Sequence, residues 1–87
     1  MASRLGFSPV FSLATIEFFT ELGTKRQEKL LACAKQLAAH PFVSPDFTTV
    51  DTAGRTICHI MTDGFILDYW VDQAARQVDI IEVCNDD

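Results

Sequence analysis

The chain lacks the sequence features that mark membrane proteins and metal-binding proteins. None of its apolar runs approaches the roughly 18–20 residues of a membrane-spanning helix. No basic segment followed by an apolar one opens the chain, so no signal peptide is expected. Its three cysteines, Cys33, Cys58 and Cys84, form neither a CxxC pair nor a zinc-ligand cluster. We therefore expect no metal or other cofactor, and three reduced cysteines packed as small hydrophobic residues in a cytoplasmic protein.

Basic residues are also scarce, and they are unevenly placed. Seven lysines and arginines stand against twelve acidic residues, a formal net charge of −5. The sequence from residue 44 onward holds only Arg55 and Arg76 against nine acids. Because phosphate backbones are bound chiefly by lysine and arginine, this half is predicted to be a poor nucleic-acid surface.

The first half of the chain is predicted to be largely helical. Eighty-seven residues, 48% of them hydrophobic, suit one globular domain spanning residues 1–87. Residues 4–7 could form a short strand. Ser8 and Pro9 then fit a helix start, because serine is a good N-cap and proline suits the first helical position. This helix would run to about Leu22, and its apolar residues exceed one stripe, so it is expected to be deeply buried or to touch a partner.

A second helix is predicted over residues 25–39. Thr24 with Gln27 fits a capping box, in which each side chain satisfies a free backbone donor. His40 precedes Pro41, and the residue before proline is pushed out of helical geometry, so the helix should end there. Only two residues separate the helices, so an antiparallel pair is expected.

The second half of the chain alternates as strands do. Asp63-Gly64 favours a tight hairpin turn, since both residue types tolerate positive φ. The predicted strands cover residues 47–51, 56–62, 65–71 and 78–83. Period-two alternation sorts their side chains onto two faces. We assign to the core, beneath the helices, Cys58, Ile60, Phe65, Leu67, Tyr69 and Val71, with the Tyr69 hydroxyl hydrogen-bonded.

The opposite face is predicted to be uncovered, because two helices can cover only one face of such a sheet. An exposed apolar cluster of this size usually marks a binding site. The candidate partner-binding residues are Ile57, His59, Met61, Ile66, Asp68 and Trp70. With no basic neighbour on its strand, Trp70 is expected to contact protein rather than a nucleic-acid base.

Several short motifs, taken together, resemble one family. They are FSP (7–9), KRQEKLLACAKQLAAHPF (25–42), AGR (53–55) and GFILDYWVDQAARQVDIIEV (64–83). In order and spacing the chain resembles the RelE/ParE superfamily of bacterial toxins from toxin–antitoxin and plasmid-stabilisation systems. The resemblance implies an α+β fold: a short N-terminal strand, then an antiparallel helical hairpin packed on a three- or four-stranded, mainly antiparallel sheet.

The residues with which this family cleaves messenger RNA are replaced here. The position after Gly64-Phe65, an arginine in the nucleases, is Ile66. Two strand positions that are often lysine fall at Ile57 and His59, and the basic position after the last strand falls near Asp86. The resemblance therefore implies no ribosome-dependent cleavage, and it leaves open the ParE-like branch that targets DNA gyrase.

Three functional hypotheses follow. The first is a RelE/ParE-like protein that acts through protein contact, with a small antitoxin or as a homodimer. The second is an active toxin, either a gyrase inhibitor or a messenger-RNA endonuclease. The third is an unrelated enzyme using His59, the one weak catalytic candidate, with Asp68. Arg55 could contact phosphate or pair with Asp51 or Asp63.

Overall fold

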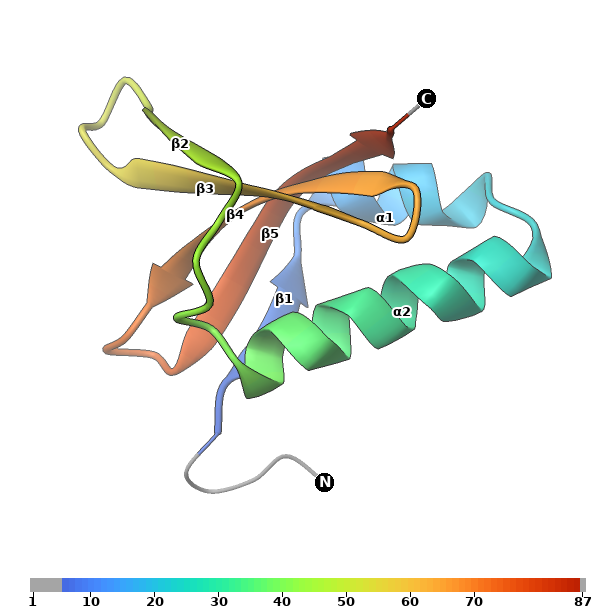
Figure 1. Cartoon of the computed structure of the whole chain (residues 1–87), viewed down its shortest axis with the longest axis horizontal. Coiled ribbons are helices and arrows are strands. Elements are labelled where there is room, and N and C mark those ends of the chain that lie inside the picture. Colours follow the sequence, from blue (N-terminus) through green and yellow to red (C-terminus); the bar gives the residue numbers. More distant parts are fainter. Residues whose placement is uncertain (1–5, 87) are drawn as a thin grey trace.

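The computed structural model describes residues 6–86 and has the α+β fold predicted from the sequence. Its elements are β1 (Ser8–Phe11), α1 (Leu13–Thr20), α2 (Thr24–Ala39), β2 (Phe47–Val50), β3 (Thr56–Thr62), β4 (Phe65–Asp72) and β5 (Gln77–Asn85). The strands form one sheet in the order β1-β5-β4-β3-β2, five strands rather than three or four (Figure 1). Every neighbouring pair is antiparallel except β1 and β5, which are parallel.

The start of the chain differs from the prediction. Residues 4 and 5 of the expected strand lie outside the described residues, and the strand observed is Ser8–Phe11, where a helix was expected. Ser12 is the true N-cap of α1, and its Oγ accepts a hydrogen bond from the Thr15 backbone N–H at 3.1 Å. The first helix was misplaced because β1 is held by pairing with a strand distant in sequence, which local helix signals cannot reveal. Pro9 is tolerated because β1 is an edge strand.

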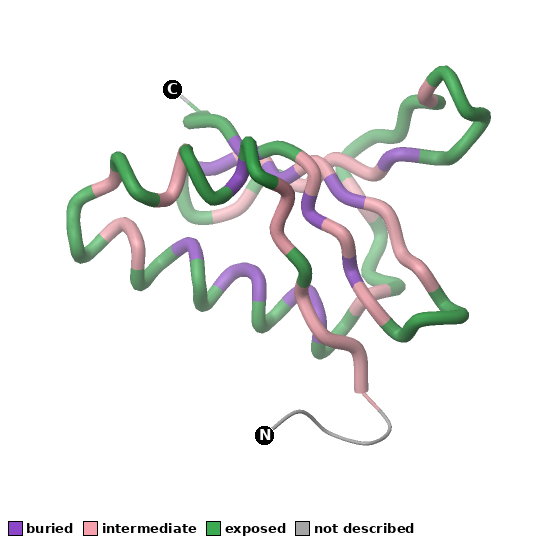
Figure 2. The backbone as a smooth tube through the Cα atoms, turned by 180° about the vertical axis from the view of Figure 1, so that it is seen from behind, coloured by how far each residue is buried: buried purple, intermediate pink, exposed green. Residues whose placement is uncertain are grey.

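Helix α2 matches its predicted span and end but not its predicted cap. Gly23 is the N-cap, with no side-chain cap bond. The Gln27 amide instead donates to the backbone carbonyl of Phe19 at 3.0 Å, tying α2 to α1. The helix ends at Ala39, and His40 is its C-cap. Its buried stripe, visible as repeated purple segments in Figure 2, consists of Leu30, Cys33, Ala34, Leu37 and Ala38.

The hairpin between β3 and β4 forms where it was predicted. Asp63 and Gly64 have φ of 52° and 84°, the two positive values that a tight hairpin turn needs. On β4, Phe65, Leu67 and Tyr69 are fully buried, as assigned. The other assigned core residues, Cys58, Ile60 and Val71, are half-buried against the same cluster.

One detail of the predicted core is wrong. Tyr69 is 0% exposed, but its hydroxyl has no hydrogen-bond partner among residues 6–86. Burial raises the pKa of Tyr69 to about 12, and the nearby Cys58 thiol adds to the rise. Tyr69 lies between Cys58 and Ile80 on the neighbouring strands, which offer little to a hydroxyl.

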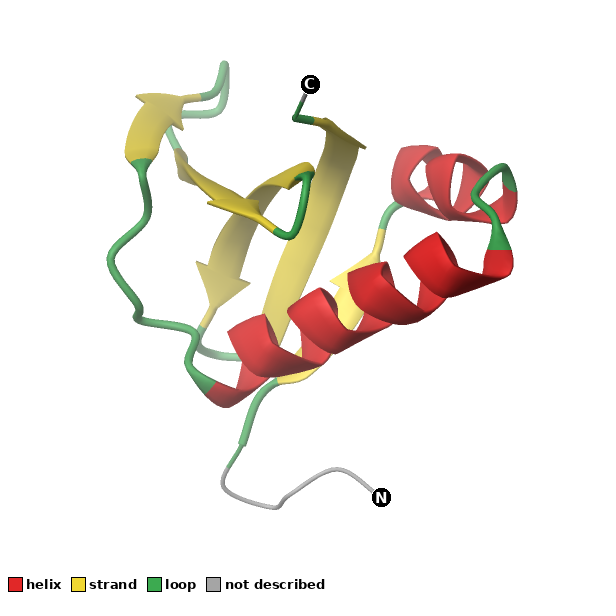
Figure 3. Cartoon of the chain, turned by 45° about the vertical axis from the view of Figure 1, so that its right-hand side comes forward, coloured by secondary structure: helices red, strands yellow, loops and turns green. Residues whose placement is uncertain are grey.

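Both helices lie on one side of the sheet, and the other side is open (Figure 3). Helix α2 and the inner residues of β4 and β5 make one cluster, against which Phe18, Phe19 and Leu22 pack from the α1 side. The Phe18 and Phe65 rings meet edge to face, with centroids 6.1 Å apart. None of the described helices is long and apolar enough to cross a membrane.

Candidate functional site

The face of the sheet turned away from the helices, here called the outer face, carries all six predicted partner-binding residues. Register fixes its membership: His59 lies opposite Asp68 and Met61 opposite Ile66, while Trp70 lies opposite Asp79. The outer face consists of Phe47 and Thr49 on β2, Ile57, His59 and Met61 on β3, Ile66, Asp68 and Trp70 on β4, and Asp79, Glu82 and Cys84 on β5. The sheet thus gathers these side chains from four strands.

The apolar side chains of the outer face differ in what a partner could reach. Phe47 and Met61 are 46% and 45% exposed. Ile66 and Trp70 are half-buried, with part of each side chain open to solvent. Ile57 is only 4% exposed. Ile57 is therefore almost inaccessible to a partner. The accessible apolar part of the outer face consists of Phe47, Met61, Ile66 and Trp70.

His59 is held from three directions. Its Nδ1 lies 2.6 Å from Asp68 Oδ1, and its Nε2 lies 2.8 Å from Thr49 Oγ1. Asp68 is an acceptor, so Nδ1 carries the proton in the neutral tautomer and the Thr49 hydroxyl donates to Nε2. The Phe47 ring stacks on the imidazole, with centroids 4.4 Å apart and planes 7° from parallel. Thr49 and Phe47 belong to this group and were not predicted from the sequence.

A row of hydroxyl, imidazole and carboxylate is also the order in which hydrolases activate a nucleophile. Such chemistry needs in addition a cleft for the substrate and donors for the developing oxyanion. The concavities described below open beside α1 and α2, on the other side of the sheet. Both ring nitrogens of His59 are already engaged. The two hydrogen bonds and the ring stack attach the edge strand β2 to the sheet through His59.

Arg55, the weak candidate for phosphate contact, is occupied within the chain. Its Nε lies 2.9 Å from Asp51 Oδ2, the first of the two alternatives considered from the sequence. Its guanidinium also lies over the Trp70 ring, 4.7 Å from the centroid. The backbone N–H of Arg55 donates to Asp51, and these contacts hold the pKa of Asp51 below its usual value. A phosphate would have to compete with both partners.

Carboxylates run alongside the apolar side chains of the outer face. Burial raises the pKa of Asp79, and the nearby Asp72 adds to the rise while Arg55 opposes it. Burial also raises the pKa of the Cys84 thiol, followed by the charges of Asp68, Glu82 and Asp86. Burial is the main cause of both pKa shifts, and acidic side chains on or next to β4 and β5 add to them. Among residues 6–86, no group of three or more histidine, cysteine or acidic side chains is arranged to hold a metal ion.

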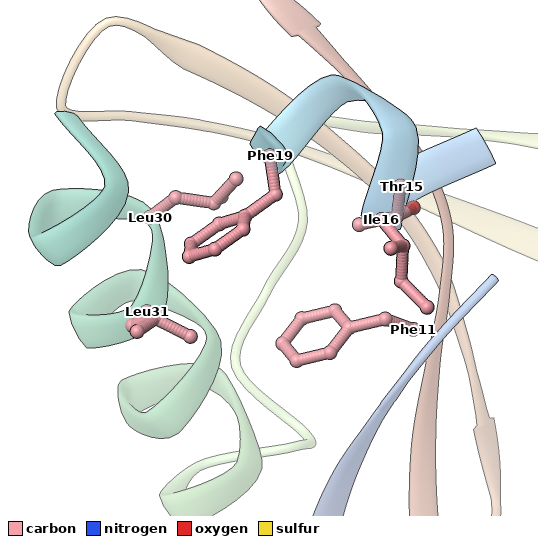
Figure 4. Close-up of a pocket in the computed structure, with 6 residues that line it drawn as sticks. All are labelled: Phe11, Thr15, Ile16, Phe19, Leu30 and Leu31. Carbon is pink, nitrogen blue, oxygen red and sulfur yellow. The ribbon is translucent and has the colours of Figure 1, made fainter. Parts of the chain in front are cut away.

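A separate apolar pocket opens where the two helices meet the free edge of β1 (Figure 4). It has a volume of about 100 Å³ and is lined by Phe11, Thr15, Ile16, Phe19, Leu30 and Leu31. Ile16 and Leu31 are 47% and 37% exposed at its rim, and nearby Leu13 is 71% exposed. The excess of apolar residues noted in the first helical segment is therefore partly surface, not core.

A shallower groove of about 390 Å³ runs between α2 and β3. Cys33 lies on its wall, with Sγ 3.4 Å from Asp63 Oδ2. Burial raises the pKa of the Cys33 thiol, and the hydrogen bond to Asp63 adds to the rise. A raised pKa leaves less of the Cys33 thiol as thiolate, which is the nucleophilic form.

Comparison with known proteins finds likeness in structure alone. No protein-family model matches the chain, and no curated protein matches it. A chain of the RelBE2 toxin–antitoxin complex of Mycobacterium tuberculosis superposes with a TM-score of 0.75 at 13% identity, over 93% of this chain and 99% of that one. The isolated RelE toxin of E. coli superposes with a TM-score of 0.73 at 17% identity, over 93% and 85%.

An archaeal example gives the same result. A chain of the RelE–RelB complex of Pyrococcus horikoshii matches with a TM-score of 0.71 at 10% identity, over 92% of this chain and 94% of that one. These superpositions cover 92–93% of this chain. The chain therefore has the fold of the RelE toxins.

Proposed function

We propose that this protein acts by binding another protein, a small partner of the antitoxin type, through the outer face of its sheet, and that it does not cleave RNA. One observation carries the proposal: accessible apolar side chains stand there among carboxylates. Phe47, Met61, Ile66 and Trp70 offer the apolar and aromatic contact that interfaces use. Arg55, the guanidinium placed on this face, is already paired.

The same composition argues against an RNA substrate. A phosphodiester needs positive charge to hold it and to stabilise the charge that develops in cleavage. Positions where the resemblance implies basic residues are Ile57, His59 and Ile66. Asp68 and Asp79 would repel the phosphates instead. His59, the remaining candidate for proton transfer, has both ring nitrogens hydrogen-bonded.

Two findings support a different chain as the partner, rather than a second copy. Two of the structures with this fold are toxin–antitoxin complexes from M. tuberculosis and P. horikoshii. A two-fold symmetric dimer through the outer face would bring together two surfaces that both carry Asp68, Asp79 and Glu82. Like charges facing each other oppose association. We therefore place homodimerisation second.

The pocket beside β1 gives such a partner another point of attachment. The outward edge of β1 can pair with an added strand. Exposed Leu13, Ile16 and Leu31 lie close to it. A partner that reached from the outer face around the β1 edge would bury both apolar surfaces.

The test is co-expression with the product of the neighbouring small gene, followed by light scattering of the purified protein. We expect a stable heterocomplex that Trp70→Asp weakens while the isolated chain keeps its circular dichroism spectrum. Val50→Asp is the matched control, because Val50 is 69% exposed on the opposite face of the sheet. Should Trp70→Asp unfold the chain, Met61→Asp makes the same test at a more exposed site. A heterocomplex indifferent to both substitutions would overturn the outer face as the binding site.

The alternative is an active toxin, which the shared fold favours. A purified chain would then arrest growth, cleave ribosome-bound messenger RNA or inhibit DNA gyrase. We expect no cleavage, because the outer face lacks the charge for it. Cleavage by the native chain that is lost in His59→Ala without loss of fold would establish the enzyme and refute the proposal.

A further inference from the structure

Arg55 shows what kind of group the outer face accepts. Its guanidinium lies over the Trp70 ring, with Cζ 4.7 Å from the centroid. Asp79 is the residue opposite Trp70 on β5, and the charge of Arg55 partly offsets the rise in its pKa, although Arg55 forms its ion pair with Asp51 instead. A positive charge here combines a cation–π contact with carboxylate attraction. At one end of the outer face the chain thus places its own arginine over the Trp70 ring.

The other end of the outer face repeats this pairing of apolar and acidic side chains, and none of the residues from 6 to 86 places a cation on it. Ile66 lies between Met61 on β3 and Cys84 on β5. Beside this apolar row lie Asp68 and Glu82, which face each other across the β4–β5 ladder. Their negative field, together with that of Asp86, helps to raise the pKa of Cys84. The side chain of Glu82 makes no hydrogen bond or ion pair with another described residue.

Asp79 adds a carboxylate in an unfavourable place. It is half-buried, its side chain accepts no hydrogen bond within residues 6–86, and burial raises its pKa. Partial burial of an unpaired charge is costly, and a cation brought by a partner would reduce that cost. The charge of the neighbouring Asp72 raises the pKa of Asp79 further, so a cation near Asp79 would be stabilising.

We propose that the segment which covers the outer face is cationic: lysine or arginine side chains that meet Asp79 and Glu82, interspersed with apolar side chains that cover Met61, Ile66 and Trp70. This inference rests on the proposed function and specifies the chemistry of its partner. It reverses the charge relation expected of a nucleic-acid surface, where the protein supplies the cations. Opposite charge across such an interface speeds association and rejects acidic competitors.

The experiment uses the full-length chain and two short synthetic peptides. In one, lysine and arginine alternate with leucine and valine; in the other, glutamate replaces every basic residue. Isothermal titration measures affinity, and NMR shift changes map the contact. We expect only the basic peptide to bind, with shifts at the Trp70 indole N–H and the Met61 methyl. Its affinity should fall steeply with added salt.

Charge-neutralising variants sharpen the test. Asp79→Asn with Glu82→Gln removes two negative charges from the outer face at nearly constant shape. Glu17→Gln with Glu21→Gln removes the same charge from the exposed surface of α1 and its C-cap. We expect the first pair of substitutions to lower the affinity for the basic peptide by about tenfold, and the second pair to lower it by less than about twofold.

Three outcomes would overturn the inference. They are equal effects of the two pairs, shifts that map to the pocket beside β1, and tighter binding of single-stranded RNA than of the basic peptide. Failure here is separable from failure of the proposed function. If Trp70→Asp abolishes the heterocomplex but Asp79→Asn with Glu82→Gln leaves it unchanged, the proposed protein binding stands. The proposed cationic character of the partner is then refuted. Self-association that the Asp79/Glu82 pair strengthens would refute both.

Discussion

His59 and Asp68 face each other across the β3–β4 ladder, with Nδ1 and Oδ1 2.6 Å apart. The carboxylate fixes the tautomer of the imidazole, and the tautomer in turn lets Nε2 accept from Thr49 on the edge strand. One partly buried proton position thereby couples three neighbouring strands.

His59→Ala is expected to lower the free energy of unfolding by about 1–2 kcal/mol, since two hydrogen bonds and the stack on Phe47 are lost together. Asp68→Asn should cost less, because the amide oxygen can still accept from Nδ1–H. Urea denaturation measures both. His40→Ala, at an exposed position, is the control and should change stability by less than about 0.5 kcal/mol. Equal losses at His59 and His40 would contradict the network's structural role.

Ser12→Ala is expected to destabilise the protein by about 1–2 kcal/mol. Ser12 caps α1 through the Thr15 N–H, and its hydroxyl donates to the carbonyl of Ile81 at 2.7 Å. The substitution thus removes a helix cap and a tie to the last strand. Ser44→Ala, in an exposed loop, should have little effect. If thermal unfolding shifts no further for Ser12 than for Ser44, the observed N-cap contributes nothing.

Tyr69→Phe is expected to be neutral or to stabilise the protein by up to about 1 kcal/mol, because it removes a buried hydroxyl without a partner. The chain has a single tyrosine, so phenolate absorbance reports Tyr69 alone. The group ionises near 10 when unfolded and near 12 when folded, so the native state keeps its proton longer. Stability should therefore fall as pH rises from about 10 to 12, and this component should vanish in Tyr69→Phe. A phenolate titration near 10 in the folded protein would refute the account.

Cys84 reports the potential of the outer face. It is exposed, whereas Cys33 is buried, so brief alkylation of the native chain should label Cys84 and spare Cys33. Neutral iodoacetamide should react faster than anionic iodoacetate by more than the two differ on a free thiol, because Asp68, Glu82 and Asp86 surround the thiolate. Glu82→Gln should bring the reaction rates of iodoacetamide and iodoacetate at Cys84 closer together. Mass spectrometry of the labelled peptides measures each rate, and an unchanged ratio would mean that the face is not negative.

Local signals predicted the parts of the fold whose contacts are close in sequence. Asp63-Gly64 specified the hairpin, and alternation placed Leu67 and Trp70 on opposite faces. Local signals did not predict the boundary between β1 and α1. Ser8-Pro9 satisfies every local rule for a helix start, yet pairing of Ser8 with Gln77 decides its structure. Only the distant strand distinguishes the two possibilities.

The candidate site was predictable to a similar extent. Period-two alternation assigned six residues to the outer face, and register confirms that they share it. Thr49 and Phe47 could not be added, because their position beside His59 depends on the register across the turn at residues 51–55. The burial of Ile57 was missed for the same reason, since Thr49 pairs with it on the edge strand. Whether a partner uses these residues remains a prediction.

The parallel pairing of β1 with β5 has a consequence for synthesis of the chain. Ser12 contacts a carbonyl 69 residues further along, so β1 and the cap of α1 lack their partner until β5 has left the ribosome. Closing so long a loop is entropically slow, and such non-local pairings delay folding. Until then, the apolar edges of β1 and β4 are exposed to aggregation and proteolysis. The chain is therefore most vulnerable in the interval before β5 pairs with β1, and a chaperone would have to act in that interval.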